Sequence, residues 1–246
     1  MKLSQRRRLI LCSWVGVAAL WPALPAVGQA DLNVEALLAS PVRSDDDRKA
    51  DAGRKPAELL RFAQVKPGMK VLDIQAGGGY TTQLMALAVG PAGKVWAQAE
   101  KARPALEKRL AAQPQANIEL LLRPLEDPYP AEAPRVDLVT LVLSYHDIAY
   151  GPVDRARMNR ALFEALRPGG HLVVIDHAAK TGSGLADTKT LHRIDEQALR
   201  AEVLAAGFKL EQEAAFLRNP EDPREQAFFD MKIPADRFAL RFVKPR

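Results

Sequence analysis

The sequence is poor in cysteine: its 246 residues include only Cys12, which lies in a segment that we expect to be removed. The rest of the chain therefore has no disulfide, no thiolate nucleophile and no cysteine-ligated zinc. No internal repeat or low-complexity tract is present. With 48% hydrophobic and 26% charged residues, the composition is that of a globular protein. It excludes a disordered protein, a collagen-like repeat and a polytopic membrane protein.

An excess of positive charge is also missing from most of the chain. The formal net charge is +5, but residues 1–30 contain four basic residues and no acidic one. The remaining 31 basic and 30 acidic residues nearly cancel. Because phosphate binding needs a basic surface, we predict that this protein does not bind nucleic acid.

Residues 1–30 have the three parts of a secretory signal. A basic start is followed by a mostly apolar stretch and then by small residues, over residues 1–8, 9–20 and 28–30. This order predicts cleavage after Ala30 and a mature protein in the periplasm or outside the cell.

Two alternatives concern the same segment. The apolar residues continue to Val27, as in an uncleaved membrane anchor, but Pro22 and Pro25 disfavour a spanning helix. We therefore predict no stable membrane insertion after cleavage. Residues 5–10 also resemble a twin-arginine signal, although three successive arginines occur in ordinary signals as well.

After a polar, charge-dense lead-in over residues 31–54 with a possible short helix, apolar strands alternate with helices. The expected strands are 71–74, 94–99, 118–122, 136–143 and 171–175, and the expected helices are 57–64, 81–89, 104–112 and 155–166. A turn is expected at 167–170. The last third is predicted to contain a helix over 194–206 and strands over 208–213 and 238–243. Near-continuous apolar strands that alternate with helices predict a parallel sheet covered on both faces.

A glycine cluster follows the first predicted strand. Gly77, Gly78 and Gly79 let the backbone turn sharply and approach a ligand without a Cβ clash. The helix that begins near Tyr80 directs its N-terminal amides toward an anionic group. Ligands of open α/β sheets bind where the strand order reverses, which predicts a site between the first and fourth strands.

A second group of polar residues follows the fourth and fifth strands. Tyr145, His146 and Asp147 come after one strand, and Asp176 and His177 end the next. A histidine beside a carboxylate is suited to act as a general base, since its ordinary pKa is about 6.5.

Other interpretations of these residues stay open. His146 can instead cap backbone groups of its loop, with Asp147 beginning a turn. A metal site formed by His146, Asp147, Asp176 and His177 has suitable ligand types, but no local spacing signature supports it and we predict no metal. For two further histidines, His171 and His192, we favour a structural role.

The motifs at 71–79, 166–172 and 206–208 resemble those of class I S-adenosylmethionine-dependent methyltransferases, over about residues 55–244. Within that superfamily, residues 54–56, 76–80, 145–147 and 191–195 are similar to a group of exported bacterial predicted methyltransferases. The resemblance implies one Rossmann-like domain over 55–246. Its fold class would be α/β, doubly wound, with a mostly parallel seven-stranded sheet, an antiparallel last strand and helices on both faces.

The resemblance also implies a cofactor, S-adenosylmethionine, and the residues that bind it: Asp73, Gly77, Gly78, Gly79, Tyr80, Glu100 and Tyr145. His146 and Asp147 are the implied catalytic residues. Two positions depart from the superfamily pattern, because Gln75 stands where glycine is common and Ala99 where an acid binds the ribose. Glu100, one position later, can replace that acid. A further departure lies in the loop after the third strand, where residues 123–125 replace the usual acid near the adenine and Asp127 follows shortly after.

The predicted activity is transfer of a methyl group from S-adenosylmethionine to an unidentified small-molecule acceptor. Such in-line displacement depends mainly on positioning and needs little acid–base equipment. No aromatic-rich groove, basic stripe or specificity motif in the sequence identifies the acceptor. The alternative is an exported, non-catalytic binding or scaffold protein that retains the fold.

Overall fold

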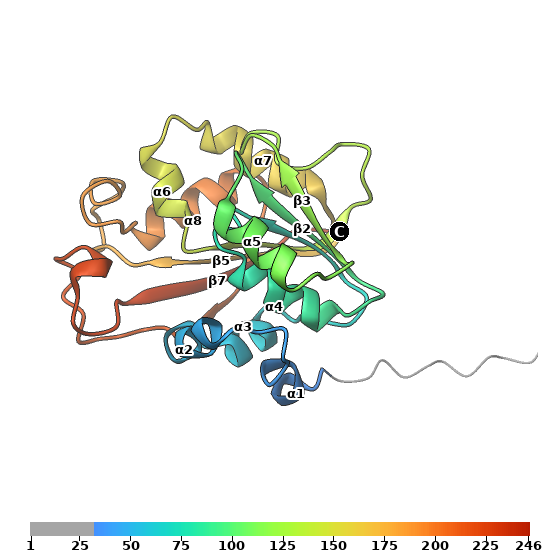
Figure 1. The fold of residues 1–246 in the computed structure, drawn as a ribbon. Helices are drawn as coiled ribbons and strands as arrows, with labels where there is room; N and C mark the ends of the chain where they lie inside the picture. The colour runs from blue at the N-terminus through green and yellow to red at the C-terminus, as the bar shows by residue number, and fades with distance from the viewer. Residues whose placement is uncertain (1–31) are drawn as a thin grey trace, which may run out of the picture.

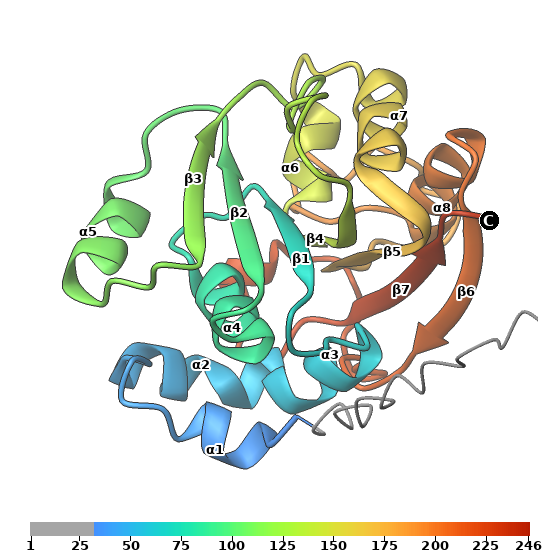
Figure 2. The same ribbon diagram turned by 90° about the vertical axis from the view of Figure 1, so that its right-hand side faces the viewer.

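A computed structural model describes residues 32–246, so the predicted signal at 1–30 lies outside the described residues. Seven strands form one sheet in the order β3-β2-β1-β4-β5-β7-β6, with helices on both faces (Figures 1 and 2). The strands are β1 Lys70–Ile74, β2 Lys94–Ala99, β3 Ile118–Leu122, β4 Val136–Val142, β5 Leu166–His177, β6 Lys209–Ala214 and β7 Arg237–Val243.

The helices begin at residues whose chemistry suits a helix start. Pro56 opens α3, Gly79 precedes α4, and the carboxylates of Asp154 and Asp195 cap α7 and α8. The helices are α1 Val34–Leu38, α2 Asp45–Arg54, α3 Pro56–Phe62, α4 Tyr80–Val89, α5 Pro104–Ala112, α6 Tyr145–Tyr150, α7 Arg155–Ala165 and α8 Glu196–Ala205, with a short 3₁₀ helix, η1, at Phe228–Asp230.

The strand directions confirm the predicted fold class. β1 pairs in parallel with both β2 and β4, and β7 runs antiparallel between β5 and β6. The strand order therefore reverses between β1 and β4, as the sequence predicted. Figure 2 shows these two strands side by side near the middle of the sheet.

Alternate residues of the buried strands supply two hydrophobic layers. Val71 of β1 packs with the layer that includes α3 and α4, whereas Leu72 packs with the layer that includes α7 and α8. In Figure 1, α1 to α4 lie on one side of the sheet and α6 to α8 on the other. Burial on both faces explains why the central strands are mostly apolar.

The local structure differs from the sequence analysis, or adds to it, in three places. The lead-in over 31–54, in which a short helix was possible, forms two helices, α1 and α2, and buries Arg43 and Asp47 through ion pairs. Residues 167–170 belong to β5, beside a register shift in its pairing with β4. Residues 145–150, which were not assigned to an element, form α6.

No helix within residues 32–246 is both long enough and apolar enough to cross a membrane.

We predict that Gly79→Ala lowers the free energy of unfolding by about 1–3 kcal/mol, because Gly79 has a positive φ of 83°. An added Cβ would also lie 2.6 Å from Leu106 Cδ1. The matched control is Gly78→Ala, where φ is not positive and no atom lies within 4 Å of the added Cβ. Urea denaturation should show a change within about 0.5 kcal/mol for the control. Equal losses for the two variants would contradict this account of the turn.

Candidate active site

A cavity of about 360 Å³ opens at the carboxyl ends of β1 and β4, where the strand order reverses. This volume is within the usual range for small-molecule sites. Residues from the glycine turn, α2 and the end of β4 line it: Asp46, Asp47, Ala50, Arg54, Asp73, Gln75, Ala76, Gly77, Gly78, Tyr80, Thr81, Arg109, Val142, Leu143 and Ser144.

The turn between β1 and α4 has a backbone that favours glycine. Gly77 and Gly79 have φ values of 56° and 83°, which side chains rarely tolerate. In α4 no side chain caps the first turn, so its backbone amides are free to meet an anionic group. The predicted role of these glycines in shaping the turn agrees with the geometry.

Asp73 lies at the end of β1 and is 2% exposed. Its carboxylate accepts hydrogen bonds from Thr82 Oγ1 of α4, at 2.6 Å, and Thr140 Oγ1 of β4, at 2.7 Å. Burial raises the pKa of Asp73 to about 6, although both threonine hydroxyls act to lower it. Asp73 therefore joins the three elements that meet at the cavity.

The two departures from the superfamily pattern lie together. Gln75 has a φ of 51°, a conformation that explains why glycine is common at this position. Its side-chain amide donates to Glu100 Oε2 at 3.1 Å, and its side-chain carbonyl accepts from Arg103 at 3.1 Å. Ala99 ends β2 and is buried, whereas Glu100 is exposed beside the cavity mouth. Glu100 thus supplies an acid one residue after position 99, where the superfamily pattern has its ribose-binding acid.

Helix α2 covers the glycine turn. Arg109 of α5 makes a bidentate ion pair with Asp47 of α2 at 2.7 and 2.8 Å, and it also donates to the carbonyl of Gly78. On the other side, the Tyr80 hydroxyl donates to Asp51 at 2.7 Å. These contacts hold residues 45–54 over the cavity.

The two tyrosines that the resemblance implied as cofactor residues occupy different places. Tyr80 lines the cavity, and the Arg54 guanidinium lies 4.7 Å above its ring. Tyr145 does not reach the cavity: it is fully buried, its hydroxyl donates to Glu202 at 2.7 Å and it accepts from Asn159. The assignment of Tyr145 to cofactor binding is therefore corrected, since its side chain points toward α7 and α8.

His146, in the first turn of α6, is held by a carboxylate on each ring nitrogen. Its Nδ1 lies 2.6 Å from Asp176 Oδ1, and its Nε2 lies 3.3 Å from Asp147 Oδ1. Asp176 also accepts from the backbone amides of His146 and His177. The buried Asp176 carboxylate thus fixes both the start of α6 and the orientation of the imidazole.

This geometry does not support His146 as a general base. Burial alone would lower the pKa of His146, but the hydrogen bonds to Asp147 and Asp176 outweigh it and raise the pKa to about 9. A ring with this pKa is mostly protonated at neutral pH, which disfavours proton acceptance by His146. The catalytic role of His146 and Asp147 stays a prediction.

Asp147 also contacts a histidine for which the sequence favoured a structural role. His192 Nδ1 lies 2.9 Å from Asp147 Oδ1. Asp147 is half-buried; burial raises its pKa, but the two histidines hold it below the usual value. His192 has a positive φ of 51°, which costs energy in a residue other than glycine and is common at functional sites. The sequence offered no signal for this contact, because 45 residues separate the partners.

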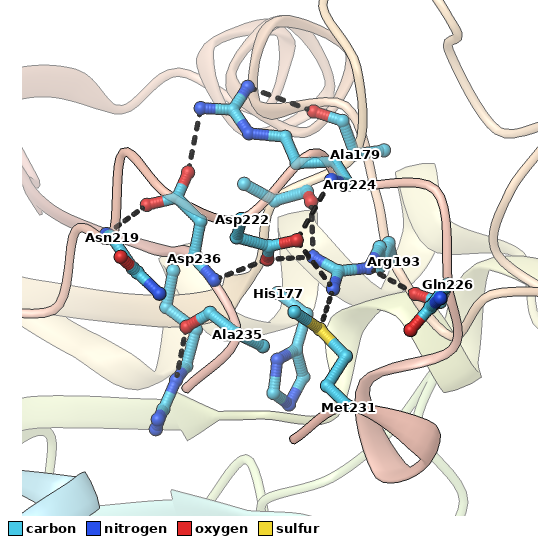
Figure 3. Close-up of polar contacts among 12 residues, drawn as sticks. His177, Ala179, Arg193, Asn219, Asp222, Arg224, Gln226, Met231, Ala235 and Asp236 are labelled. Carbon is cyan, nitrogen blue, oxygen red and sulfur yellow. Dashed lines mark hydrogen bonds and ion pairs between the residues drawn. The ribbon is translucent and has the colours of Figure 1, made fainter. Parts of the chain in front are cut away.

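His177 takes no part in the contact between His192 and Asp147. Its ring stacks on Phe228 of η1 with centroids 4.0 Å apart, and burial lowers its pKa to about 2. Figure 3 shows how Arg193 fixes the loop that carries Phe228: it pairs with Asp222 at 2.8 Å and donates to the Gln226 carbonyl.

The sequence predicted several of these positions and missed others. It placed the glycine turn, Asp73, Tyr80 and Glu100 near one another, and the structure brings them together. It missed the threonines that hold Asp73, together with Arg109 and the lead-in acids, because their contacts are made across different elements. The available signal was Thr140, a polar residue in the middle of a mostly apolar strand.

The fold and this cavity define a class I S-adenosylmethionine-dependent methyltransferase, and its cofactor is S-adenosylmethionine. Residues 36–180 match the family model of protein-L-isoaspartate(D-aspartate) O-methyltransferase (PCMT), and the chain belongs to this family. A ubiquinone/menaquinone biosynthesis C-methyltransferase of Burkholderia multivorans is 33% identical over 126 residues. That match covers 49% of this chain and 48% of the relative, so the chain spans about half the length of the curated relatives it matches.

Solved structures agree on the fold. An S-adenosylmethionine-dependent methyltransferase from Aquifex aeolicus has a TM-score of 0.58 at 18% identity, covering 76% of this chain and 88% of its own. A 1,6-didemethyltoxoflavin-N1-methyltransferase from Burkholderia thailandensis, solved with S-adenosylhomocysteine, has a TM-score of 0.56 at 17% identity and covers 82% of both chains. These structures show the fold, and the family match favours an enzyme over the non-catalytic alternative.

We predict that Asp73 makes stability depend on pH. Because folding raises its pKa from 3.8 to about 6, the native state binds more protons than the unfolded state between these values, and stability falls as the pH rises through this window. The cost of the buried charge is of the order of 3 kcal/mol above pH 6. Asp73→Asn removes it, so urea titrations should show the variant gaining stability relative to the wild type from pH 4 to pH 7. Parallel pH profiles would contradict the prediction.

Proposed function

We propose that this methyltransferase acts on a small molecule with a planar ring, bound over the carboxyl ends of β4 and β5. The observation that carries the proposal is the cavity at the reversal of strand order, since it lies beside the cluster of His146 and exposed aromatic residues. Cofactor and acceptor would then meet above the end of β4.

The residues around the cavity suit the cofactor. Backbone amides at the start of α4 and the guanidinium of Arg54 offer positive charge to the cofactor's carboxylate. Gly77 and Gly78 are exposed and allow close approach of a ligand to the backbone. The side chains of Gln75 and Glu100 provide a donor and an acceptor for ribose hydroxyls. When bound, S-adenosylmethionine supplies an electrophilic methyl group.

Helix α2 contributes by covering the site. The Arg109–Asp47 and Tyr80–Asp51 contacts hold it against the glycine turn. A covered site excludes water and restricts the motion of the bound molecules, which is how most of the acceleration of a displacement reaction arises. This role requires no general base, in agreement with the protonated state of His146.

The acceptor class is inferred from the side chains beside α6. Phe229 is 61% exposed and Tyr150 is 48% exposed, and both rings lie within 6 Å of the His192 ring. Exposed aromatic groups at the edge of a site favour an apolar, planar ligand. The nearly neutral charge of residues 31–246 argues against nucleic acid as the acceptor. The relatives' C-methyltransferase name is compatible with a ring carbon, and the family's name with a carboxylate oxygen.

We predict that Arg54→Ala weakens the binding of S-adenosylmethionine by about 10- to 100-fold, since a hydrogen bond to a charged group is worth about 1.5–3 kcal/mol. Titration calorimetry measures the change. The control is Lys49→Ala on the same helix, because Lys49 is largely exposed and pairs only with Asp46. An unchanged affinity in Arg54→Ala would remove Arg54 from the site. No heat from the wild type at millimolar cofactor would overturn the proposed site.

We also propose that residues 1–30 direct export and that the mature protein lies in the periplasm or is secreted. The support is the basic, apolar and small-residue order of the segment. Fractionation of expressing bacterial cells followed by N-terminal sequencing should find a chain that starts at Asp31 outside the cytoplasm. Replacing Arg6, Arg7 and Arg8 by lysine should block export only if the twin-arginine route is used. Full-length protein confined to the cytoplasm would refute the proposal.

A further inference from the structure

Three potential metal ligands converge beside the cofactor cavity. They are His146 Nε2, Asp147 Oδ1 and His192 Nδ1, and all three atoms lie within 4.8 Å of one another. Asp147 Oδ1 is central, at 3.3 Å from His146 Nε2 and 2.9 Å from His192 Nδ1. Helix α6 supplies two of the three residues, and the loop before α8 supplies the third.

Asp176 orients the ring of His146. Metal-binding histidines are usually oriented in this way, by a carboxylate or carbonyl on the ring nitrogen that does not bind the metal. Its buried carboxylate accepts from the backbone amides of His146 and His177 and lies 2.6 Å from His146 Nδ1. A carboxylate that only accepts requires the hydrogen of the neutral ring to be on Nδ1, which leaves the Nε2 lone pair directed at the Asp147 carboxylate. Two lone pairs repel at this distance, so a positive charge must lie between them, either a proton on Nε2 or a metal ion in its place.

We propose that His146, Asp147 and His192 bind one divalent transition-metal ion, with Zn²⁺ as the ion that best fits two imidazoles and a carboxylate. Donor atoms bonded to zinc at about 2.0–2.1 Å are about 2.9–3.3 Å apart for angles between 90° and tetrahedral. Both distances from Asp147 Oδ1 fall in this range. The inference goes beyond the proposed methyl transfer and does not depend on it.

The surroundings of the three ligands suit a site that remains open on one side. The His146 side chain is 2% exposed, whereas those of His192 and Asp147 are 28% and 49% exposed. An ion can therefore enter from solvent without a change of fold. Three protein ligands leave at least one position for water or for an oxygen atom of another molecule, as in catalytic rather than structural zinc sites. The strained φ of His192 is consistent with a side chain held in place for binding.

The test uses the tag-free full chain, freed of metal with a chelator and titrated with ZnCl₂ in a calorimeter. We expect one ion per chain, and we expect Co²⁺ in the same site to give the visible absorption of a nitrogen- and oxygen-ligated ion. His192→Ala should weaken Zn²⁺ binding by more than the 10- to 100-fold that loss of an orienting partner typically costs. Asp147→Asn, a conservative change at a half-exposed position, provides a second test if the first variant is unstable.

The matched control is His171→Ala. His171 lies in β5, five residues before Asp176, and pairs with Glu211 at 3.1 Å. Its loss should therefore leave the stoichiometry and affinity of Zn²⁺ binding unchanged. Absence of Zn²⁺ binding by the wild type at about 0.1 mM ZnCl₂, a Kd that corresponds to about −5.5 kcal/mol, would overturn the proposal. It would also be overturned if folded His192→Ala and Asp147→Asn bound Zn²⁺ as tightly as the control.

Discussion

The buried ion pair between Arg193 and Asp222 holds together the part of the molecule that completes the carboxyl end of the sheet. Both side chains are fully buried, and Arg193 also donates to the carbonyls of Ala178 and Gln226. Breaking such a pair by removing one partner typically costs about 3–5 kcal/mol, because the other charge is left buried alone. This pair fixes the loops after β5 and β6 to each other (Figure 3). The same loops carry His192 and Phe228, whose ring stacks on His177.

The site consists of two halves with different origins. The cofactor half is a short turn with a helix start, in which Gly77 and Gly79 set the backbone and Asp73 joins β1 to α4 and β4. The half that we propose for the acceptor depends on Asp176, which fixes α6 and the His146 ring, and on loops that return from the last third of the chain. Helix α2 covers the cavity, so charged residues that precede residue 55, the predicted start of the domain, also belong to the site.

Burial decides the chemistry of the ionisable groups. Asp73 and His146 are both nearly inaccessible, yet the pKa of each is raised for a different reason. Desolvation dominates at Asp73, where two hydroxyl donors only partly offset it, whereas two carboxylates dominate at His146. A sequence shows neither effect, so the pattern around His146 predicted a general base and could not indicate the raised pKa that the structure gives.

The sequence by itself determined the fold class, the order of the strands along the chain and the glycine turn. These follow from local patterns, namely apolar runs, caps and glycines, which act within about ten residues. Only the tertiary structure decided that Tyr145 points away from the cavity, that residues 45–54 cover it and that His192 meets Asp147. Each of these depends on contacts between elements far apart in sequence, where packing and charge pairing, rather than local propensity, select the partner.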